Sequence, residues 1–375
     1  NTSKYDDYVC KVEKADIKEP RTYDEAIQCV DSKQWKLAMD DEMKAIHQNN
    51  TWKLIDLPKD RKAIGSKWVF KVKRDVDGKV LRYKTRLVAQ GFNQKYGTDY
   101  DEVFAPVVRP STFRTLLSVA AKRKYHVKHY DIKTAFLNGK LDEEIYMKQP
   151  PGHTNGNKVC KLMKGLYGLK QSARSWNKAI HNVLMSNTYK QSRYDKCLYM
   201  KTIGNQNCYI LIYVDDLIIA SNSSTEINNI ASKIGSNFEM KCLGDIKQFL
   251  GMEIEQNHDG DFLLSQRNYI DKIVEDCGLI NGKISRFPLD TGYEKLTSDK
   301  IYQKIIGQLL YSSTNTRPDI TASVSILSQR MSKPRDIDLT EVKRVVRYLK
   351  GTRQYRLRLS SNALEQNLIM YTDTN

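Results

Sequence analysis

The stretch CYILIYVDDLIIA, residues 208–220, places two adjacent carboxylates, Asp215 and Asp216, inside an otherwise apolar run. Each apolar arm is short and rich in isoleucine, tyrosine and valine, which favours a strand over a helix. The stretch therefore predicts two strands joined by a tight turn, with the acids at its tip. Two interpretations remain open. Aspartate is a common turn residue, and paired carboxylates can also hold a divalent metal ion with the help of a third.

The composition is that of a soluble globular protein of two or three domains. The 375 residues are 40% apolar with a mean hydropathy of −0.59, and the chain is long enough to bury a sizeable core. No apolar run approaches the roughly 18 residues of a membrane span, and the polar start lacks a signal peptide. Because no methionine begins the chain, we expect a piece processed or excised from a longer protein.

The charge balance indicates a polyanionic partner. Lysine and arginine total 61 against 44 aspartates and glutamates, which gives a net charge of +17 and a pI of about 9.3. Such an excess is typical of nucleic-acid-binding proteins, although a generally basic protein is the alternative. The seven cysteines are scattered without a CxxC pair, which predicts free or buried thiols in a reducing compartment and no zinc site.

A pair of cations on one strand offers a candidate phosphate site. Residues 67–90 alternate apolar and basic side chains around the turn signal Asp77-Gly78, which predicts a long hairpin. Lys84 and Arg86 on the return strand are two residues apart and so point to one face. They can grip a triphosphate or a template backbone, or they can simply form a solvated face.

Asp131, at the end of a predicted strand that has Val127, His129 and Asp131 on one face, offers the third carboxylate. Three carboxylates on adjacent strands can hold two Mg²⁺ ions, one activating an attacking hydroxyl and the other stabilising the leaving oxygen. Oxygen ligands suit Mg²⁺, with Mn²⁺ as a substitute, and no soft ligand is needed. In a basic chain this constellation indicates nucleotidyl transfer.

The remaining pattern predicts an α+β plan, in which strands give way to helices toward the C-terminus. Helices are indicated by apolar faces at helical spacing and by capping residues. We expect them over residues 34–49, from a cap at Ser111, from the Ser223–Glu226 capping box and through much of the chain beyond Arg267. A further helix is expected after the loop of residues 165–168, with Gln171, Ser172 and Arg174 in its first turns.

Shorter segments are interpreted from turn and strand signals. Residues 51–58 are expected to be a connector, Asn138-Gly139 a turn, and the terminal LIMYTDTN, residues 368–375, a strand. The last predicted helix carries a basic face, which is either solvated or lies along a nucleic-acid backbone. That face is formed by Lys343, Arg344, Arg347 and Lys350.

The sequence YVDDLIIAS, residues 213–221, resembles the signature of reverse transcriptases, and its flanking blocks resemble the Pol polyprotein of copia-type (Pseudoviridae) LTR retrotransposons. The blocks follow the family order from about residue 33 to the end of the chain. They are WKLAMDDEMKAI with NTWKL, KWVFKVKRDVDGKVLRYKTRLVAQGF, FAPVVR, DIKTAFLNGKLDEEIYMKQPPG, KLMKGLYGLKQSARSW, FLGMEI, TRPDI and KRVVRYLKGT.

The resemblance implies a right-hand polymerase, with fingers and palm of antiparallel sheet plus helices and a mainly helical thumb and connection. The implied bounds are an N-terminal extension at 1–32, fingers at 33–125, palm at 126–265 with a finger-derived segment near 150–190, thumb and connection at 266–365, and the start of a ribonuclease H domain at 366–375. Asp373 matches the first catalytic residue of that nuclease. Because the chain ends two residues later, we expect no working nuclease site.

The resemblance also assigns residues around the incoming nucleotide. It implies that Asp131, Asp215 and Asp216 are the catalytic residues and bind two metal ions. Phe136 would be a steric gate, a ring that rejects ribonucleotides by crowding the 2′-hydroxyl position. The triphosphate would be held by Lys84 and Arg86, and Gln171 would contact the incoming nucleotide or the template.

Two further assignments concern the primer end and the leaving group. Leu250, Gly251 and Met252 resemble the primer-grip hairpin, whose backbone seats the primer terminus. Lys241 is a candidate proton donor to pyrophosphate. The histidines, including His129, are interpreted as structural.

The implied activity is RNA-directed and DNA-directed DNA synthesis that copies retrotransposon RNA into cDNA. Its partners would be an RNA template, a DNA or tRNA primer, dNTPs and other segments of the same polyprotein, with no membrane. The expected location is a cytoplasmic virus-like particle with access to the nucleus, and the sequence does not indicate an oligomeric state. Two alternatives stay open: a catalytically decayed copy that only binds nucleic acid, and a structural or packaging protein of the particle.

Overall fold

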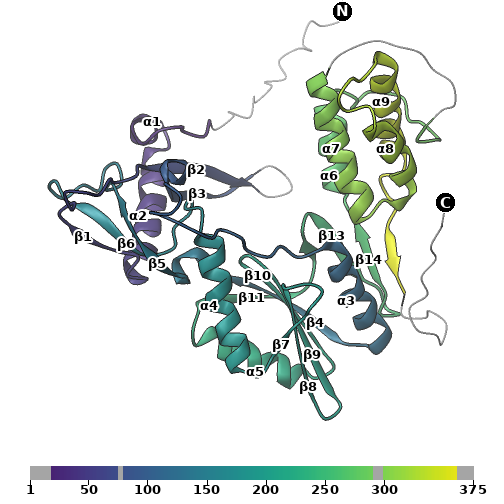
Figure 1. The fold of residues 1–375 in the computed structure, drawn as a ribbon. Helices are drawn as coiled ribbons and strands as arrows, with labels where there is room; N and C mark the ends of the chain where they lie inside the picture. Colours follow the sequence, from purple (N-terminus) through teal and green to yellow (C-terminus); the bar gives the residue numbers. More distant parts are fainter. Residues whose placement is uncertain (1–17, 75–78, 290–298, 361–375) are drawn as a thin grey trace, which may run out of the picture. The chain divides into compact units, whose positions relative to one another are not determined.

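The computed structural model describes residues 18–74, 79–289 and 299–360, and these form two compact units (Figure 1). The first unit takes its residues from Asn1–Ala105 and Thr134–His181, and the second from Pro106–Lys133 and Asn182–Asn375. The expected turn at Asp77-Gly78, the expected strand at 368–375 and the nuclease residue Asp373 lie outside the described residues. In the part that is described, no helix has both the length and the apolar character needed to cross a membrane.

The first unit combines helices with two small antiparallel sheets. One sheet has the strand order β1-β6-β5, and the other is the β2-β3 hairpin. Its elements are α1 Tyr23–Gln28, α2 Ser32–Gln48, β1 Trp52–Ile55, β2 Ser66–Arg74, β3 Val80–Ala89, η1 Gly91–Asn93, η2 Ala135–Asn138, β5 Lys140–Met147 and β6 Val159–Lys164, followed by α4 Ser172–Ser186, which runs on into the second unit.

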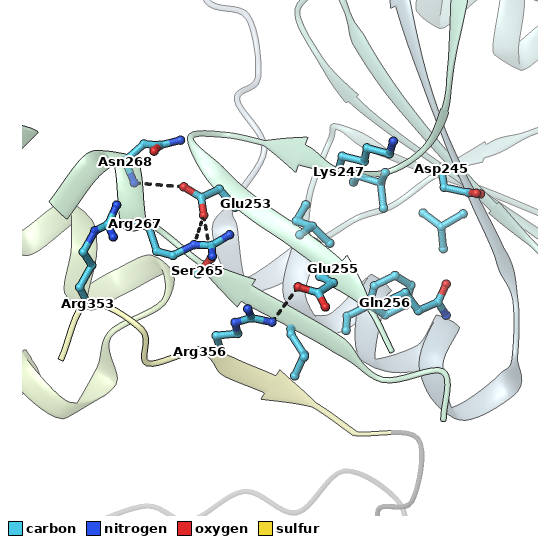
Figure 2. A pocket seen from close by; sticks show the side chains of 15 residues that line it. Asp245, Lys247, Glu253, Glu255, Gln256, Ser265, Arg267, Asn268, Arg353 and Arg356 are labelled. Atoms are coloured by element: carbon cyan, nitrogen blue, oxygen red, sulfur yellow. Dashed lines mark hydrogen bonds and ion pairs between the residues drawn. The ribbon is translucent and has the colours of Figure 1, made fainter. Parts of the chain in front are cut away.

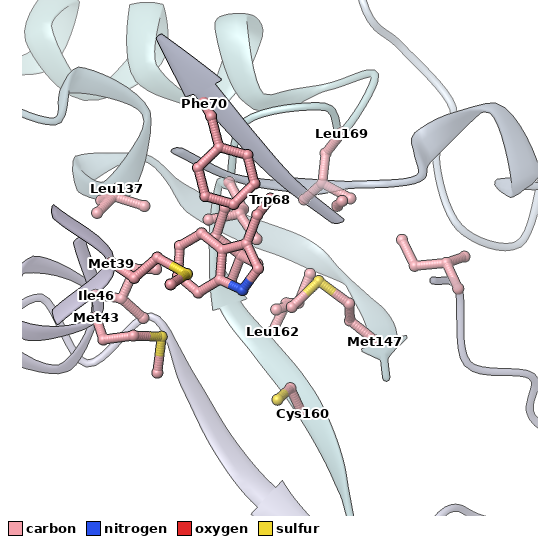
Figure 3. Close-up of a cluster of buried hydrophobic side chains, with 14 of the residues drawn as sticks. Met39, Met43, Ile46, Trp68, Phe70, Leu137, Met147, Cys160, Leu162 and Leu169 are labelled. Carbon is pink, nitrogen blue, oxygen red and sulfur yellow. The ribbon is translucent and has the colours of Figure 1, made fainter. Parts of the chain in front are cut away.

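The core of the first unit follows directly from periodicity. The apolar face of α2 buries Trp35, Met39, Met43 and Ile46, and the buried alternation of β2 brings Trp68 and Phe70 into the same cluster (Figure 3). The ring of Trp35 meets that of Phe70 edge-on, with 5.3 Å between the ring centroids. The predicted helix and hairpin are both confirmed, because each matches the period of its secondary structure.

One segment of the first unit was predicted wrongly. Residues 51–58 were expected to be a connector, but Trp52–Ile55 forms β1 and pairs antiparallel with β6, Trp52 opposite Leu162. The partner strand lies far along the chain, so the local sequence carried no sign of the pairing. The turn expected at Asn138-Gly139 is the end of the 3₁₀ helix η2.

The second unit begins with a six-stranded antiparallel sheet of order β11-β4-β10-β9-β8-β7. Its elements are α3 Pro110–Arg123, β4 His126–Ile132, β7 Lys190–Gln191, β8 Leu198–Ile203, β9 Gln206–Tyr213, β10 Asp216–Ser221, α5 Ser224–Gly235 and β11 Met240–Asp245. The hydroxyl of Ser223 accepts the N–H of Glu226 (3.3 Å), which confirms the cap of α5.

Helix α3 begins one residue earlier than its predicted cap. Pro110 is the first helical residue and Arg109 is the N-cap, so the assignment of Ser111 as the cap is wrong. Proline suits the first helical position because its missing N–H would have no partner there. Phe113, Leu116 and Leu117 of α3 are buried in a cluster that also contains Val127 and Ile218 of the six-stranded sheet.

A second sheet and a helical bundle complete the second unit. The sheet has the order β12-β13-β14-β15, with β12 Gln248–Phe249, β13 Met252–Gln256, β14 Phe262–Ser265 and β15 Leu357–Leu359. Strand β15, which the sequence analysis did not predict, returns after the bundle and pairs with β14. The bundle consists of α6 Arg267–Asp276, α7 Asp299–Asn315, η3 Pro318–Ile320, α8 Thr321–Ser328 and α9 Asp336–Gly351.

The basic face of α9 is largely engaged within the protein. Lys350 donates to the backbone carbonyls of Ile280 (2.6 Å) and Gly282 (2.7 Å) in the loop after α6. Arg344 forms an ion pair with Glu341 (3.1 Å). Two of the four cations on this face therefore have intramolecular partners, which weakens both the solvated-face and the nucleic-acid interpretations for them.

Candidate active site

The two adjacent aspartates lie at a two-residue hairpin turn, as predicted. Tyr213 of β9 pairs with Asp216 of β10, so Val214 and Asp215 form the turn between them. Val214 has a φ of 54°, an unfavourable value for a β-branched residue. The N–H of Ile132 donates to the carbonyl of Asp215 (2.8 Å), which fixes the strained turn against the end of β4. Such local strain is typical of functional sites.

Asp131 lies on the strand next to this turn. In the antiparallel β4–β10 pair, Asp131 is directly opposite Asp216. Residues in this relation have Cβ atoms about 5 Å apart. On the other side of β4, Lys241 of β11 is opposite Asp131, and its side chain is exposed. The sheet register therefore gathers the three predicted carboxylates and the predicted proton donor at one end of the sheet.

His129 contacts the carboxylate pair, which the sequence analysis did not predict. Its Nε2 lies 2.7 Å from Oδ1 of Asp216, and the imidazole is buried. His129 and Asp131 are two residues apart on β4, so strand alternation was a signal that they share a face. A carboxylate that binds metal is commonly held by such a hydrogen bond. The contact adds a specific partner to the structural interpretation of His129.

The three aspartates fit a magnesium site in donor type and in strand placement. Their oxygens are the ligands that Mg²⁺ prefers, and Asp131 and Asp216 are register neighbours. Within the described ranges, no three histidine, cysteine, aspartate or glutamate side chains already converge as a metal cage. The like charges of the carboxylates oppose such convergence when no cation compensates them.

The predicted primer grip is a second tight turn in the same unit. Phe249 pairs with Met252, which leaves Leu250 and Gly251 as the turn residues, with φ values of 48° and 66°. The hydroxyl of Tyr311, on α7, donates to the carbonyl of Leu250 (2.5 Å). Burial raises the pKa of Tyr311, which keeps this hydroxyl protonated and able to donate.

A cavity of about 570 Å³ is lined both by Asp216 and by the predicted primer-grip turn. Its walls include Asp216 and Tyr213 from the β9–β10 hairpin, together with Leu250, Gly251 and Tyr311. One open space is therefore lined by a carboxylate of the predicted triad and by the strained Leu250-Gly251 turn. This arrangement suits the end of a polymer strand that must meet the carboxylates.

A larger cavity of about 690 Å³ lies on the β13–β14 hairpin, and two of its carboxylates, Glu253 and Glu255, are paired with lining residues (Figure 2). Glu253 accepts from Arg267 (2.7 Å), Ser265 (3.0 Å) and the N–H of Asn268 (3.0 Å). Burial alone would raise the pKa of Glu253, but these hydrogen bonds outweigh it and lower the pKa. Arg356 pairs with Glu255 (2.7 Å). These contacts brace the hairpin against α6 and β15.

The predicted phosphate-binding cations lie on β3 in the first unit. Lys84 and Arg86 are half-buried on one face of β3, while Thr85 and Leu87 are buried on the other. Burial lowers the pKa of Lys84, and the charge of Arg86 lowers it further. The carboxylate of Glu42 acts on the pKa of Lys84 in the opposite sense. A partly dehydrated cation with like charges nearby gains more from an anionic ligand than a fully solvated one. This surrounding favours the phosphate interpretation over a solvated face.

The predicted steric gate lies in the same unit and shares a neighbour with Arg86. Phe136, on η2, meets the ring of Tyr167 with 4.9 Å between the ring centroids. The guanidinium carbon of Arg86 lies 4.4 Å from the centroid of that same ring. Tyr167 belongs to the loop between β6 and α4, and neither periodicity nor a polar motif singled it out.

Gln171 is more deeply placed than the prediction implied. Its side chain is buried and its amide donates to the carbonyl of Asp99 (2.8 Å) and to Glu143 (3.1 Å). Its Oε1 accepts from the amide of Gln94 (3.0 Å). Gln171 therefore ties three segments of the first unit together, and a contact with nucleotide or template stays a prediction.

The comparison with known families agrees with the site. Residues 49–291, more than half of the chain, match the family described as reverse transcriptase (RNA-dependent DNA polymerase). The mixed helices and antiparallel sheets are consistent with an α+β polymerase fold. The chain belongs to the reverse transcriptase family.

Relatives place this domain within transposon proteins. The Pol polyprotein of transposon TNT 1-94 from Nicotiana tabacum is 39% identical over 90% of this chain, and that of transposon RE1 from Arabidopsis thaliana is 38% identical over 92%. The chain spans only 27% and 24% of these polyproteins. The transposon Ty5-1 protein of Saccharomyces cerevisiae is 36% identical over 65% of this chain and 82% of its own length.

Proposed function

We propose that this chain synthesises DNA on RNA and DNA templates by two-metal nucleotidyl transfer. The observation that carries the proposal is the sheet register that sets Asp131 opposite Asp216, beside the strained Val214-Asp215 turn. If Asp215 and Asp216 served only to form the turn, no third aspartate would be needed on the neighbouring strand. A turn role alone therefore does not explain Asp131. Membership of the reverse transcriptase family supports the same reaction.

The three aspartates would hold two Mg²⁺ ions, and Mn²⁺ would substitute. When bound, the ions supply activation of the primer hydroxyl and neutralise charge on the phosphates. The chain itself supplies the orientation of the ligands. His129 holds the carboxylate of Asp216, and the N–H of Ile132 holds the turn at Asp215. Both contacts restrict the aspartates to the end of the sheet.

The nucleotide would be selected by residues of the first unit. Lys84 and Arg86 would receive the triphosphate, since they are half-buried cations on one strand face. Phe136 would crowd the 2′-hydroxyl of a ribonucleotide. Gln171, hydrogen-bonded to Asp99 and Glu143, would contact the nucleotide or template from the loop before α4.

The primer end would be seated by the β12–β13 turn. Leu250, Gly251 and Met252 would present their backbone to the primer terminus in the cavity that also contains Asp216. Lys241, exposed and opposite Asp131, is suitably placed to give a proton to the leaving pyrophosphate.

The proposed biological setting is that of a retrotransposon, and similarity to transposon Pol polyproteins supports its nucleic-acid partners. The partners would be retrotransposon RNA as template, a DNA or tRNA primer, dNTPs and the other segments of a Pol polyprotein. The location would be a cytoplasmic virus-like particle with access to the nucleus. The competing proposal, a decayed copy that only binds nucleic acid, is disfavoured because all three aspartates and their sheet register are present.

Primer extension by the purified protein tests the function. With Mg²⁺ and dNTPs, we expect extension of a DNA primer on RNA and on DNA templates, and we expect Asp215→Asn to abolish it. Asp142→Asn, which removes an exposed carboxylate paired with Lys178, is the matched control and should leave extension unchanged. Extension that survives Asp215→Asn would contradict the metal assignment. Retained template binding without any extension by the wild type would favour the decayed copy.

A further inference from the structure

Tyr167 contacts two side chains with separate predicted roles toward one nucleotide. Its ring lies 4.4 Å from the guanidinium carbon of Arg86, measured to the ring centroid. The ring of Phe136 meets it edge-to-face, at 4.9 Å between centroids and an interplanar angle of 63°. The three side chains are half-buried and come from β3, η2 and the loop between β6 and α4.

The loop that carries Tyr167 is fixed against β3. The N–H of Ala89 donates to the carbonyl of Tyr167 (2.8 Å). The next residue, Gly168, has a φ of 91°, and a Cβ there would lie 2.1 Å from the carbonyl oxygen of Ala89. Only glycine allows so close an approach of the two backbones. The ring of Tyr167 therefore starts from a backbone that is anchored to the strand of Arg86.

The two contacts restrict different motions: the rotamers of Arg86 and the ring orientation of Phe136. Arginine has a long side chain with many rotamers, and a ring below its guanidinium favours one of them through cation–π attraction. Phenylalanine is held by the edge-to-face contact, which sets the plane of its ring. A steric gate excludes the 2′-hydroxyl group only if the phenyl ring keeps one rotamer. Tyr167 therefore restricts both Arg86, the proposed triphosphate ligand, and Phe136, the proposed steric gate against a 2′-hydroxyl group.

We propose that Tyr167 is a positioning residue that sets Arg86 and Phe136 at a constant spacing, so that triphosphate binding and sugar discrimination are coupled. This inference rests on the proposed function, because it takes the roles of Arg86 and Phe136 from it. Removal of the aromatic ring should weaken nucleotide binding and relax sugar selection together. Removal of the hydroxyl alone should do neither.

Equilibrium nucleotide binding tests this without requiring catalysis. The protein is loaded with a template and a primer that ends in a dideoxynucleotide, and dATP and ATP are titrated with Mg²⁺. For Tyr167→Leu we expect dATP affinity to fall about fivefold, the size of one exposed cation–π contact. The preference for dATP over ATP should fall about tenfold, as the edge-to-face contact is lost. Tyr167→Phe, the matched control, should stay within about twofold of the wild type.

Two additional variants separate positioning from general damage. Tyr167→Met fills the volume without a π face and should reproduce the Leu variant, with a thermal midpoint close to that of the wild type. In a Phe136→Ala background, Tyr167→Leu should lower sugar preference no further, because its effect acts through Phe136.

The outcomes distinguish this inference from the proposed function. Wild-type selectivity in the Leu and Met variants, or an equal loss in Tyr167→Phe, would overturn the role of the ring. Additive losses in the double variant would overturn the action through Phe136. If the wild type extends primers but the Tyr167 variants match it, only the inference fails. If the wild type neither binds dATP nor extends a primer, the proposed function fails as well.

Discussion

Among the described residues, Arg317 is the most deeply buried lysine or arginine. Its side chain is 2% exposed and forms two hydrogen bonds with Asp319, at 2.9 and 2.7 Å. It also donates to the hydroxyl of Thr352 (2.6 Å) and lies over the ring of Tyr348. This arginine joins η3 to the end of α9, and it explains the TRPDI block in terms of folding.

Asp319 should give the second unit a measurable dependence on pH. Burial raises the pKa of Asp319, but the hydrogen bonds and charge of Arg317 outweigh burial and lower it below the ordinary 3.8. Its stabilising effect is therefore full above 3.8 and is lost as pH falls through the lower folded value. Asp319→Asn, which leaves Arg317 buried and unpaired, should destabilise by about 3 kcal/mol at pH 7.

Urea unfolding of the wild type and Asp319→Asn at pH 7 and at steps down to pH 3 checks this prediction. The difference between the two should shrink as the pH falls below 3.8. The control is Asp336→Asn, an exposed residue in the first turn of α9. A difference that stays constant with pH would show that the carboxylate charge of Asp319 is not the stabilising feature.

The sequence identified chemical groups at this scale but not their neighbours. Asp215 and Asp216 stood out because unpaired carboxylates are costly in an apolar stretch, and Asp131 was selected only because that pair required a third carboxylate. The contact of His129 with Asp216 was accessible through strand alternation. Tyr167 and Tyr311 were not, because their partners lie on elements distant in the chain and aromatic residues are normally assigned to the core.

At the scale of elements, Tyr311 links α7 to the primer-grip turn. Tyr311→Phe removes only the hydroxyl that donates to Leu250. One hydrogen bond contributes about 0.5–1.5 kcal/mol, so primer–template should dissociate roughly two- to tenfold faster. The affinity for dNTP should be unchanged. A trap experiment that measures dissociation of labelled primer–template checks both statements in one preparation.

Tyr269→Phe is the matched control, because its ring contacts that of Tyr311 (5.1 Å between centroids). It should dissociate at the wild-type rate. If Tyr311→Phe also behaved as the wild type, the carbonyl of Leu250 would not depend on this donor for its position.

Long elements that repeat their hydrophobic spacing several times were predicted well, and short strands were not. Helix α2 and the β2-β3 hairpin show several repeats of their own spacing, so local sequence was sufficient. Strands β1 and β15 have four and three residues, and each is defined by a partner far away in the chain. For α3, proline at the first helical position was a stronger signal than the serine after it.

At the scale of the whole molecule, the net charge of +17 should make nucleic-acid binding strongly salt-dependent. A protein that contacts six to ten phosphates loses about 10³–10⁵ in affinity between 50 and 200 mM salt. The slope of binding against salt also distinguishes two roles for Lys84. If Lys84 binds template backbone, Lys84→Ala should reduce the slope by about one. If it binds only the triphosphate, the slope should not change.

Fluorescence anisotropy of a labelled primer–template, titrated at four salt concentrations without dNTP, measures that slope. Lys53→Ala, an exposed lysine on β1, is the control for general loss of charge. An equal reduction of the slope in the two variants would indicate a general loss of charge and would contradict a specific contact of Lys84 with the template backbone.

Strand β15 has a consequence for how the protein is made. Leu264 of β14 pairs with Leu357 of β15, so about 90 residues separate the two partners in the chain. At 5–20 residues per second, a ribosome takes roughly 5 to 20 seconds to synthesise that interval. Throughout this time β14 is an open edge to which another chain can add. The sheet that holds the primer-grip turn is thus among the last parts to close, and crowded polysomes would favour pairing between nascent chains at this strand.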